Sequence, residues 1–298
     1  MRAAAALAAW FLEETGAVVQ VKVVSYDALF DTIKRDRAAA TPTYDVFLIF
    51  YTDLARLVER DALMDLTELI ERDATIEPED SLPSLYDAYS LYHGKRWALP
   101  FDGDTHVLFY RKSILARHRL SPPETWDDYA HVARTITEKE RSNGIYGAAI
   151  MGHPAPVLIV SSFMTLNAGL AIAVASRTRE PAVARAFAAF ATRRDIALRL
   201  NLLNGGCDPT RISVPTSDEY KRFAPDVNAA KKASLKHTVA WPRLPETPQL
   251  LDVLSKQLVS ALEGRVSAQQ ALVASQRQWQ QILARTGLQV TDTPPPPR

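Results

Sequence analysis

An α/β architecture is the fold class that the sequence predicts, and three observations predict it. The stretch AVVQVKVVSY, residues 17–26, alternates apolar and polar side chains as a half-buried strand does. The stretch VFLIF, residues 46–50, is wholly apolar, which suits a strand buried on both faces of a parallel sheet. Apolar residues at helical spacing follow each stretch, and this alternation of strand and helix is typical of α/β proteins.

The chain opens with MRAAAALAAWFLEETG, which we interpret as an amphipathic helix that ends at Gly16. Glu13 and Glu14 interrupt the apolar run, and no small-residue cleavage site follows, so the segment does not have the pattern of a signal peptide. No apolar run approaches the length that a membrane-spanning helix needs.

Further elements follow in order along the chain. The segment SPPETWDDYAHVARTITEKER, residues 121–141, begins with a Ser, prolines and acids and therefore predicts a capped helix, which Asn143 and Gly144 end. Other helices are expected over residues 26–37, 54–60, 66–72, from 78–90 onwards, 180–203 and 250–286. Short strands are expected over residues 97–100, 107–110 and 145–151, and a Pro-rich extended tail over 287–298.

Composition excludes several classes of partner. The 298 residues carry a formal net charge of +1 with acids and bases interspersed, which predicts neither a nucleic-acid partner nor a membrane surface. Cys207 is the only cysteine, so an intrachain disulfide and a CxxC site are impossible, and a reducing cytosol and an export compartment are both compatible. No cofactor motif and no metal-ligand spacing of histidines is present.

The turn DGD, residues 102–104, poses the main chemical question. In DGDTH the residues Asp102, Asp104 and His106 resemble the first motif of haloacid-dehalogenase-type phosphatases, in which one Asp attacks phosphorus and both hold magnesium. The later acidic motif that would complete such a metal site is missing, which disfavours a magnesium-dependent phosphatase. Serine-hydrolase and nucleotide-binding motifs are absent too, and we expect no catalytic residue and no enzyme.

Recognition of a polyhydroxylated molecule fits the DGD turn better. Carboxylates accept hydrogen bonds from hydroxyl groups, and aromatic rings stack on the C–H face of a sugar. Acids lie beside aromatic residues at three places: Tyr51 with Asp53, Phe101 with the DGD turn, and Trp241 beside Arg243. Asp53 alternatively caps the helix that starts at Leu54, and Trp241 alternatively anchors the core.

The ordered segments resemble one known family. They are ALAAWFLEETGAVVQVKVVSYDALFDTI, TYDVFLIFYTDLARLVERDALMDLTELI, GKRWALPFDGDTHVLFYRKSIL, PETWDDYAHVARTIT, GLAIAVASRTREPAVARAFAAFATRRDIALRL, NGGCDPTRISV and WPRLPETPQLLDVLSKQLVSALEGRVSAQQAL. Together they are similar to the extracellular solute-binding proteins, family 1, of bacterial ABC sugar importers, the group of maltose- and polyol-binding proteins.

This resemblance implies a periplasmic-binding-protein-like (class II) two-lobed fold with a reduced second lobe. It implies a carrier that closes on a sugar or sugar alcohol and delivers it to ABC transporter permease subunits, and a monomer in the periplasm or on the outer side of the membrane. A homologue that no longer binds ligand is the remaining alternative. The implied ligand-binding residues are Tyr51, Asp53, Asp102, Asp104, Arg211 and Trp241.

The resemblance also implies boundaries and departures from the family pattern. Residues 1–105 would form the N-lobe, 106–204 the C-lobe elements, and 205–286 a loop and helices across both lobes. An export signal and the first sheet strand would be absent, and the second lobe would be shortened near residues 151–167. Sequence alone selects neither the sugar nor the export route.

Overall fold

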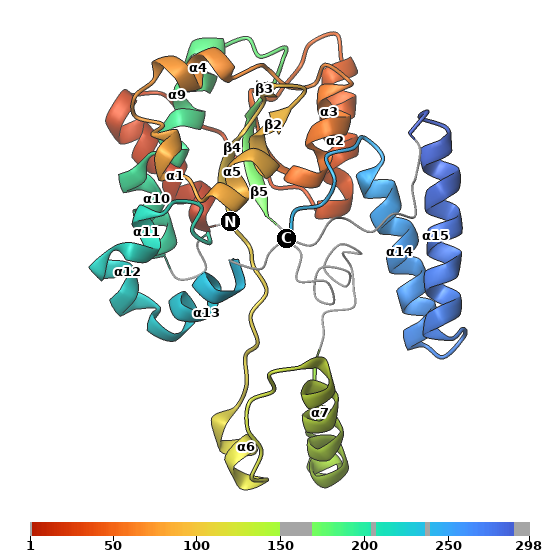
Figure 1. Ribbon diagram of the computed structural model, residues 1–298. Coiled ribbons are helices and arrows are strands. Elements are labelled where there is room, and N and C mark those ends of the chain that lie inside the picture. The colour runs from red at the N-terminus through yellow and green to blue at the C-terminus, as the bar shows by residue number, and fades with distance from the viewer. Residues whose placement is uncertain (1, 150–168, 204–206, 236–238, 289–298) are drawn as a thin grey trace.

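A three-stranded sheet lies at the centre of the molecule (Figure 1). The computed structural model describes residues 2–149, 169–203, 207–235 and 239–288. Strand β5 (Leu170–Val174) is the middle strand and pairs antiparallel with both β1 (Val46–Phe50) and β4 (Leu99–Asp102). A register shift between Pro100 and Asp102 marks a bulge at the end of β4.

The expectation of a parallel sheet around residues 46–50 is wrong, because the neighbour of β1 is the antiparallel β5. The expectation that this strand is buried on both faces is confirmed in part, because one face is buried and the other is partly buried. Phe47 and Ile49 belong to one hydrophobic cluster, and Val46 and Leu48 pack against the other. An antiparallel strand with a core on each face is therefore as apolar as a parallel one.

Strand β5 separates the two hydrophobic cores. Ala171 and Ala173 point into the first core, and Ile172 and Val174 into the second, as the period of two in a strand requires. Helices α2 (Tyr26–Ala38), α3 (Leu54–Val58), α5 (Pro83–Ser90) and α14 (Thr247–Leu262) supply the first core. Helices α1 (Arg2–Thr15), α4 (Thr67–Arg72), α9 (Pro181–Thr192) and α10 (Arg194–Asn201) supply the second.

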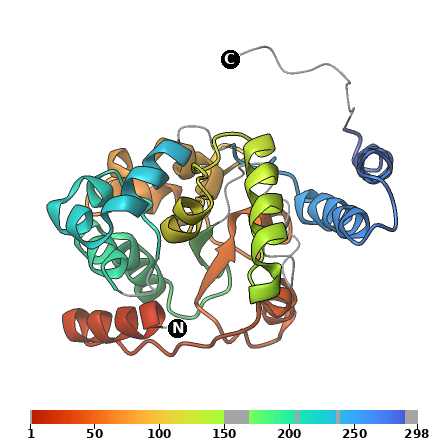
Figure 2. The same cartoon turned by 90° about the horizontal axis from the view of Figure 1, so that it is seen from below.

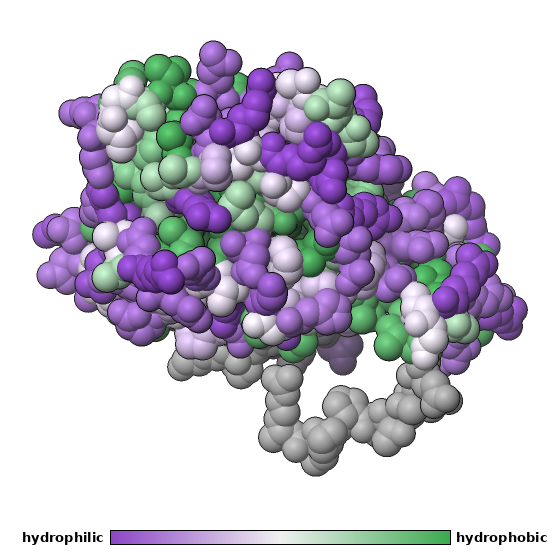
Figure 3. All heavy atoms as spheres, turned by 90° about the horizontal axis from the view of Figure 1, so that it is seen from above, coloured by the Kyte–Doolittle hydropathy of each residue, from purple (hydrophilic) through white to green (hydrophobic). Residues whose placement is uncertain are grey.

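Shorter elements complete the main body. They are the helical turns η1 (Tyr51–Asp53) and η2 (Pro78–Asp80), the two-stranded β2 (Leu91–Tyr92) and β3 (Lys95–Arg96), and the consecutive helices α11 (Ser213–Thr216), α12 (Asp218–Phe223) and α13 (Pro225–Leu235). Figure 3 shows polar and charged residues over most of one face of the molecule, with hydrophobic residues in small separate patches. None of the described helices is long and apolar enough to cross a bilayer.

Helices α6 (Lys112–Arg117) and α7 (Trp126–Glu140) form a small unit away from the sheet (Figure 1), and Figure 2 views the molecule from the side of this unit. They have their own core of Ile114, Leu115, Val132 and Ile136. A capping box of Thr125 and Asp128 begins α7, as predicted, and the turn η3 (Arg141–Asn143) and Gly144, with φ of 72°, end it. The chain between the sheet and this unit, residues 103–111, is neither helix nor strand.

The carboxylate of Glu140 stabilises the base of the same unit. It accepts hydrogen bonds from Asn143, His118 and Arg117, and these bonds lower the pKa of Glu140 to about 2. The small α6–α7 core is therefore supplemented by a polar network at one end.

The C-terminal helices make a hairpin that projects from the body (Figure 1). Helix α15 (Ala268–Ala284) starts at a capping box of Ser267 and Gln270 and packs along α14. The indole N–H of Trp279 donates to the Leu250 carbonyl oxygen, at 2.8 Å. The helical region expected over residues 250–286 is thus two helices joined by a turn.

Three predicted strands are absent from the described residues. Residues 17–25 are extended but pair with no described strand, and Val18, Val21 and Val23 are exposed. Residues 107–110 and 145–149 are irregular, and residues 150–151 lie outside the description. The helix predicted over 180–203 is broken at Arg193, whose backbone is extended. An alternating pattern indicates strand propensity, but a ladder also needs a neighbouring strand.

The central position of β5 predicts that its core side chains dominate stability. We expect Ile172→Ala to lower the free energy of unfolding by about 2–5 kcal/mol, because Ile172 is 1% exposed and pairs with both β1 and β4. Urea unfolding measures the loss. Val183→Ala on the exposed side of α9 is the control and should change the free energy by less than about 0.5 kcal/mol. Equal effects would contradict the placement of Ile172.

Candidate functional site

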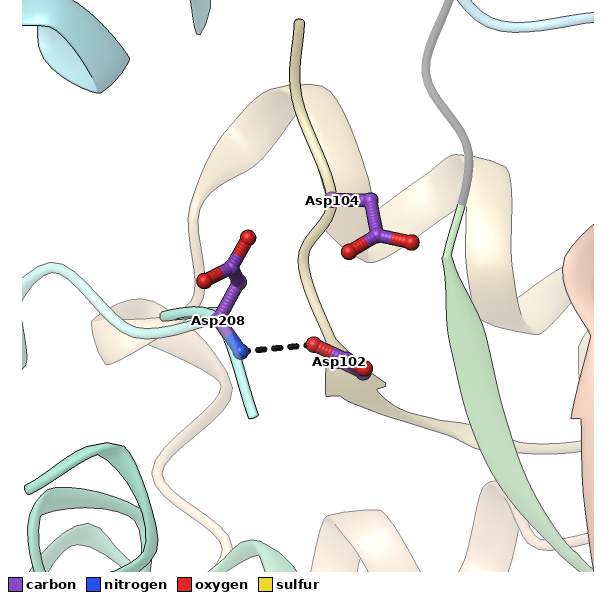
Figure 4. Close-up of side chains that lie close together, drawn as sticks. All are labelled: Asp102, Asp104 and Asp208. Atoms are coloured by element: carbon purple, nitrogen blue, oxygen red, sulfur yellow. Dashed lines mark hydrogen bonds between the residues drawn. The ribbon is translucent and has the colours of Figure 1, made fainter. Parts of the chain in front are cut away.

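Three aspartates lie close together where β4 leaves the sheet (Figure 4). One carboxylate oxygen each of Asp102, Asp104 and Asp208 lies within 4.8 Å of the others, and all three residues are partly buried. Figure 4 shows the three side chains grouped in a triangle, with Asp102 and Asp104 on one segment and Asp208 on another that is far away in the sequence. We call this group the acidic cluster.

Backbone pairing between these two segments builds the cluster. The Asp208 N–H donates to Oδ1 of Asp102 at 2.6 Å, and the Gly103 N–H donates to the Asp208 carbonyl oxygen at 3.1 Å. A Cβ on Gly103 would lie 2.3 Å from the carbonyl oxygen of Pro209, which is too close for any side chain. Glycine is therefore required between Asp102 and Asp104 for the two segments to meet.

An aromatic stack adjoins the acidic cluster. The rings of Tyr51 and Tyr89 are parallel, with centroids 4.6 Å apart, and the Tyr51 hydroxyl accepts from the Trp241 N–H at 3.2 Å. A Cβ on Gly169 would meet both the Tyr89 hydroxyl and the Asp102 carbonyl oxygen, so these two groups are near each other. Burial raises the pKa of Tyr89, and Tyr51 and the three aspartates raise it further.

Burial also controls the protonation of the carboxylates. Loss of water raises the pKa of Asp102 to about 6 and that of Asp104 to about 7, and repulsion from Asp208 adds to both. Lys231 on α13 forms an ion pair with Asp208 and opposes the increase. Both carboxyls therefore hold a proton more readily than an exposed aspartate does, and a carboxyl that holds a proton can donate a hydrogen bond as well as accept one.

Asp102 and Asp104 differ in what they already hold. One oxygen of Asp102 is bound to the Asp208 backbone, whereas the Asp104 carboxylate has no hydrogen bond to the described residues. Three carboxylates are oxygen ligands of the kind that hard cations prefer. The ammonium group of Lys231 lies beside them and pairs with Asp208.

Arg211 lies inside the body, where its side chain connects three segments. Its Nε donates to the Thr192 carbonyl oxygen at 2.6 Å, and Nη2 donates to the Ile76 carbonyl oxygen at 2.7 Å. Nη1 lies 3.1 Å from Asp80, and Arg211 is only 3% exposed. These contacts indicate that Arg211 holds the three segments together. The guanidinium group is directed at these partners, which does not support the ligand contact expected for Arg211.

Asp53 and Trp241 are buried near the first core. Asp53 lies before α3 without a side-chain cap bond and forms a 2.6 Å ion pair with Arg56, while burial raises its pKa. Trp241 belongs to the core cluster, and its indole Nε1 has no hydrogen-bond partner among the described residues. The backbone N–H of Trp241 bonds to Tyr51, whose ring stacks on Tyr89 beside the acidic cluster. Asp53 forms no hydrogen bond or ion pair with the cluster among the described residues.

Sequence reasoning missed Asp208, Lys231 and Tyr89. Asp208 stands three residues before Arg211 in the segment NGGCDPTRISV, so an acid beside the two glycines of that segment was the available signal. Tyr89 and Lys231 lie on helices without any motif, and only the fold brings them to the DGD turn.

Comparison with known proteins gives a family match over more than half of the chain. The family model of bacterial extracellular solute-binding proteins matches residues 1–169. An uncharacterized ABC transporter extracellular-binding protein of Pyrococcus horikoshii is 37% identical over 62 residues, which are 20% of this chain and 14% of that protein. The aligned part thus spans about one seventh of the length of that curated relative.

Two solved structures share the fold across nearly their whole length. A solute-binding protein of an ABC transporter from Thermotoga lettingae with α-D-tagatose has a TM-score of 0.77 and 17% identity, covering 93% of this chain and 94% of that one. One from Agrobacterium vitis with D-mannitol has a TM-score of 0.77 and 17% identity, covering 96% of each chain. The fold is therefore the two-lobed fold of periplasmic solute-binding proteins.

The contacts of Arg211 predict a large stability loss when it is removed. We expect Arg211→Met to lower the free energy of unfolding by about 3–5 kcal/mol, because Asp80 and two carbonyl groups lose a buried partner. Urea unfolding tests this, and Arg72→Met, at an exposed ion pair with Glu68, should cost less than about 1 kcal/mol. A stable Arg211→Met protein would refute the anchoring role.

The raised pKa values of the acidic cluster predict a stability term that decreases with pH. Below about pH 4 these carboxyls are protonated in both the folded and the unfolded chain. Between about pH 4 and 7 the folded chain binds more protons than the unfolded chain, so the free energy of unfolding falls as the pH rises. Urea unfolding at pH 4 and at pH 7 measures this term. The free energy of unfolding of Asp104→Asn, relative to that of the original chain, should be more than about 1 kcal/mol higher at pH 7 than at pH 4. The exposed change Glu68→Gln serves as the control. A pH-independent difference for Asp104→Asn would contradict the raised pKa.

Proposed function

Because the chain belongs to the bacterial extracellular solute-binding protein family, we propose that it is the substrate-binding protein of an ABC importer for a sugar or sugar alcohol. The acidic cluster is the observation that carries this proposal. Asp102, Asp104 and Asp208 present several carboxylate oxygens to one small space, next to a stack of tyrosine rings. A molecule with neighbouring hydroxyl groups suits such a set of acceptors.

The protonation of the cluster supports binding of neutral hydroxyl compounds. A polyol hydroxyl is both a donor and an acceptor, and a partly protonated group of carboxyls offers both as well. The ion pair of Lys231 with Asp208 lowers the local negative charge of the cluster. Tagatose and mannitol, bound by two proteins of the same fold, are compounds of this class.

Hinge closure is the proposed mechanism. The α6–α7 unit represents the second lobe, and residues 103–111 connect it to the body directly after the acidic cluster. Two contacts fix the start of this connection: Thr105 to the Ser234 hydroxyl at 2.7 Å, and the Ser234 hydroxyl to the His106 carbonyl oxygen at 2.8 Å. A ligand that contacts both lobes stabilises the closed form more than the open one, and that difference shifts the population.

Two alternatives lose support. A phosphatase would use Asp102 as a nucleophile with magnesium, but Asp102 already accepts a hydrogen bond from the Asp208 backbone, and the family match is to binding proteins. A homologue without ligand binding would have no need of three partly buried carboxyls whose loss of water and mutual repulsion raise the pKa values of Asp102 and Asp104. Keeping such a group together costs stability.

The remaining parts of the proposal concern the setting of the protein. The matched family is extracellular, and we infer that this chain works in the periplasm or on the outer side of the cell membrane as a monomer. The permease subunits of the importer would be its protein partners. The N-lobe would comprise residues 1–105 together with β5, α9 and α10, because these pack around the same sheet as β1 and β4. Of the range 106–204 expected for the second lobe, the α6–α7 unit would belong to that lobe. The shortened region near 151–167 lies outside the described residues.

A thermal-shift screen followed by calorimetry tests the proposal. D-tagatose, D-mannitol, ribitol, maltose and other sugars are screened, and at least one should raise the melting temperature as mass action requires. No increase with any compound, together with hydrolysis of p-nitrophenyl phosphate in magnesium, would support the phosphatase instead.

Asp104 is the side chain whose removal tests the site most cleanly. We expect Asp104→Ala to weaken binding of the compound found in the screen at least tenfold, because one buried acceptor contributes on the order of 1–3 kcal/mol. The melting temperature without ligand should not fall, since Asp104 holds no hydrogen bond to the described residues. Asp252→Ala, at an exposed ion pair on α14, is the matched control. Unchanged affinity in Asp104→Ala would remove this residue from the site.

A further inference from the structure

Helix α13 contacts both of the segments that carry the acidic cluster. Lys231 forms an ion pair with Asp208. Three residues later, Ser234 bonds to Thr105 and to the backbone of His106, which follow the DGD turn. Helical residues at this spacing lie on the same face. One face of α13 therefore touches the Asp208 loop and the chain that leaves β4 at the same time.

The hydroxyl of Ser234 lies in the middle of a short chain of hydrogen bonds. It donates its proton to the His106 carbonyl oxygen at 2.8 Å. Since a hydroxyl has a single proton, the 2.7 Å bond between Thr105 Oγ1 and Ser234 is donated by Thr105. All three residues are partly buried. Ser234 therefore holds the side chain of one residue and the backbone of the next.

Asp104 lies between two fixed points of the backbone. On one side the Gly103 N–H donates to the Asp208 carbonyl oxygen at 3.1 Å, and on the other side Ser234 holds Thr105 and the residue after it. The Asp104 carboxyl forms no hydrogen bond to the described residues (Figure 4). Its place in the cluster is therefore determined by the backbone on either side of it.

The chain changes character directly after these contacts. Residues 103–107 are buried or partly buried, whereas Leu108, Phe109 and Tyr110 are exposed, and residues 108–111 are neither helix nor strand. Backbone with few buried contacts and no secondary structure opens most easily. Bending between the body and the α6–α7 unit is therefore expected beyond residue 107, and Ser234 holds the last part of the connection that belongs to the body.

We propose that Ser234 is a positioning residue for ligand binding, which holds Asp104 in the acidic cluster while the second lobe moves. This role rests on the proposed function, because Asp104 is the acceptor that Ser234 keeps in place for the ligand. Thr105 completes the contact as the donor to Ser234, and Lys231 holds the Asp208 side of the cluster from the same helix. The hinge then consists of residues 108–111, and its bending leaves the acceptors on the body where they are.

A carbon-13 NMR titration of the ligand-free protein tests this role through the Asp104 carboxyl. Burial and repulsion from Asp102 and Asp208 raise the pKa of Asp104 to about 7, against the opposing charge of Lys231. We expect Ser234→Ala to lower the titration midpoint of Asp104 by about one pH unit or more, because the carboxyl then moves towards water and away from the other acids. Ser234→Thr keeps the hydroxyl and should restore the midpoint of the original chain.

The position of the hydroxyl, not the composition of α13, should decide the result. The double change Ala233→Ser with Ser234→Ala moves the hydroxyl by one residue, a rotation of about 100° around the helix, and should titrate like Ser234→Ala alone. Ala233 is exposed, so it tolerates the exchange. The buried carboxyl of Asp53, which pairs with Arg56, should keep its midpoint in every variant. An unchanged midpoint of Asp104 in Ser234→Ala would overturn the role, whether or not the protein binds a sugar.

Ligand binding gives a second test with its own outcomes. For the compound found in the thermal-shift screen, Ser234→Ala should weaken binding about fivefold or more in the original chain, but less than about twofold in Asp104→Asn, because changes that act through one group are not additive. An equal loss in both backgrounds would contradict a role through Asp104. If no compound binds and the Asp104 midpoint still falls in Ser234→Ala, the proposed function fails while the positioning of Asp104 by Ser234 stands.

Discussion

The close approach of the end of β4 to the loop around Asp208 is the constraint on which the rest of the structure depends. Two hydrogen bonds join these segments, from Asp208 N–H to Asp102 and from Gly103 N–H to the Asp208 carbonyl oxygen. The approach is possible only because Gly103 has no side chain to meet the Pro209 carbonyl oxygen. The same contact brings a third carboxylate to the DGD turn.

This approach has an electrostatic cost that explains the chemistry of the site. Three carboxyls in partly buried positions repel one another, and desolvation disfavours their charged forms. The protein offsets part of this cost with Lys231 and with the buried contacts of Arg211 to Asp80, which hold the loop in place from its other side. Such a cluster is unfavourable as scaffold alone, so a hydroxyl-rich ligand that hydrogen bonds to it gives a physical reason for its presence.

Local patterns in the sequence predicted the helices well and the sheet only in part. The capped helix α7 and the apolar strand β1 could be recognised because their signals are local. The antiparallel neighbour of β1 could not, since LAIAV at residues 170–174 lies in a long apolar stretch where strand and helix look alike. Residues 17–25 have a strand pattern, but among the described residues no strand lies beside them to pair.

The candidate site, too, could be predicted from the sequence only in part. Asp102 and Asp104 could be chosen because no local capping role accounts for two acids around a glycine, and the fold adds Asp208 to them. Arg211 was chosen from the resemblance of its loop, but its guanidinium group is directed at carbonyl groups and Asp80. Loop membership gives a position along the chain, whereas the direction of a side chain depends on which carbonyl groups the fold brings near it.

Carbon-13 NMR of the aspartate carboxyl groups, with and without the compound that most raises the melting temperature, tests the central claim most directly. If the acidic cluster holds the ligand, the resonances of Asp102, Asp104 and Asp208 shift on saturation, while that of the exposed Asp252 does not. Saturable binding that leaves all three cluster resonances unchanged would contradict the claim.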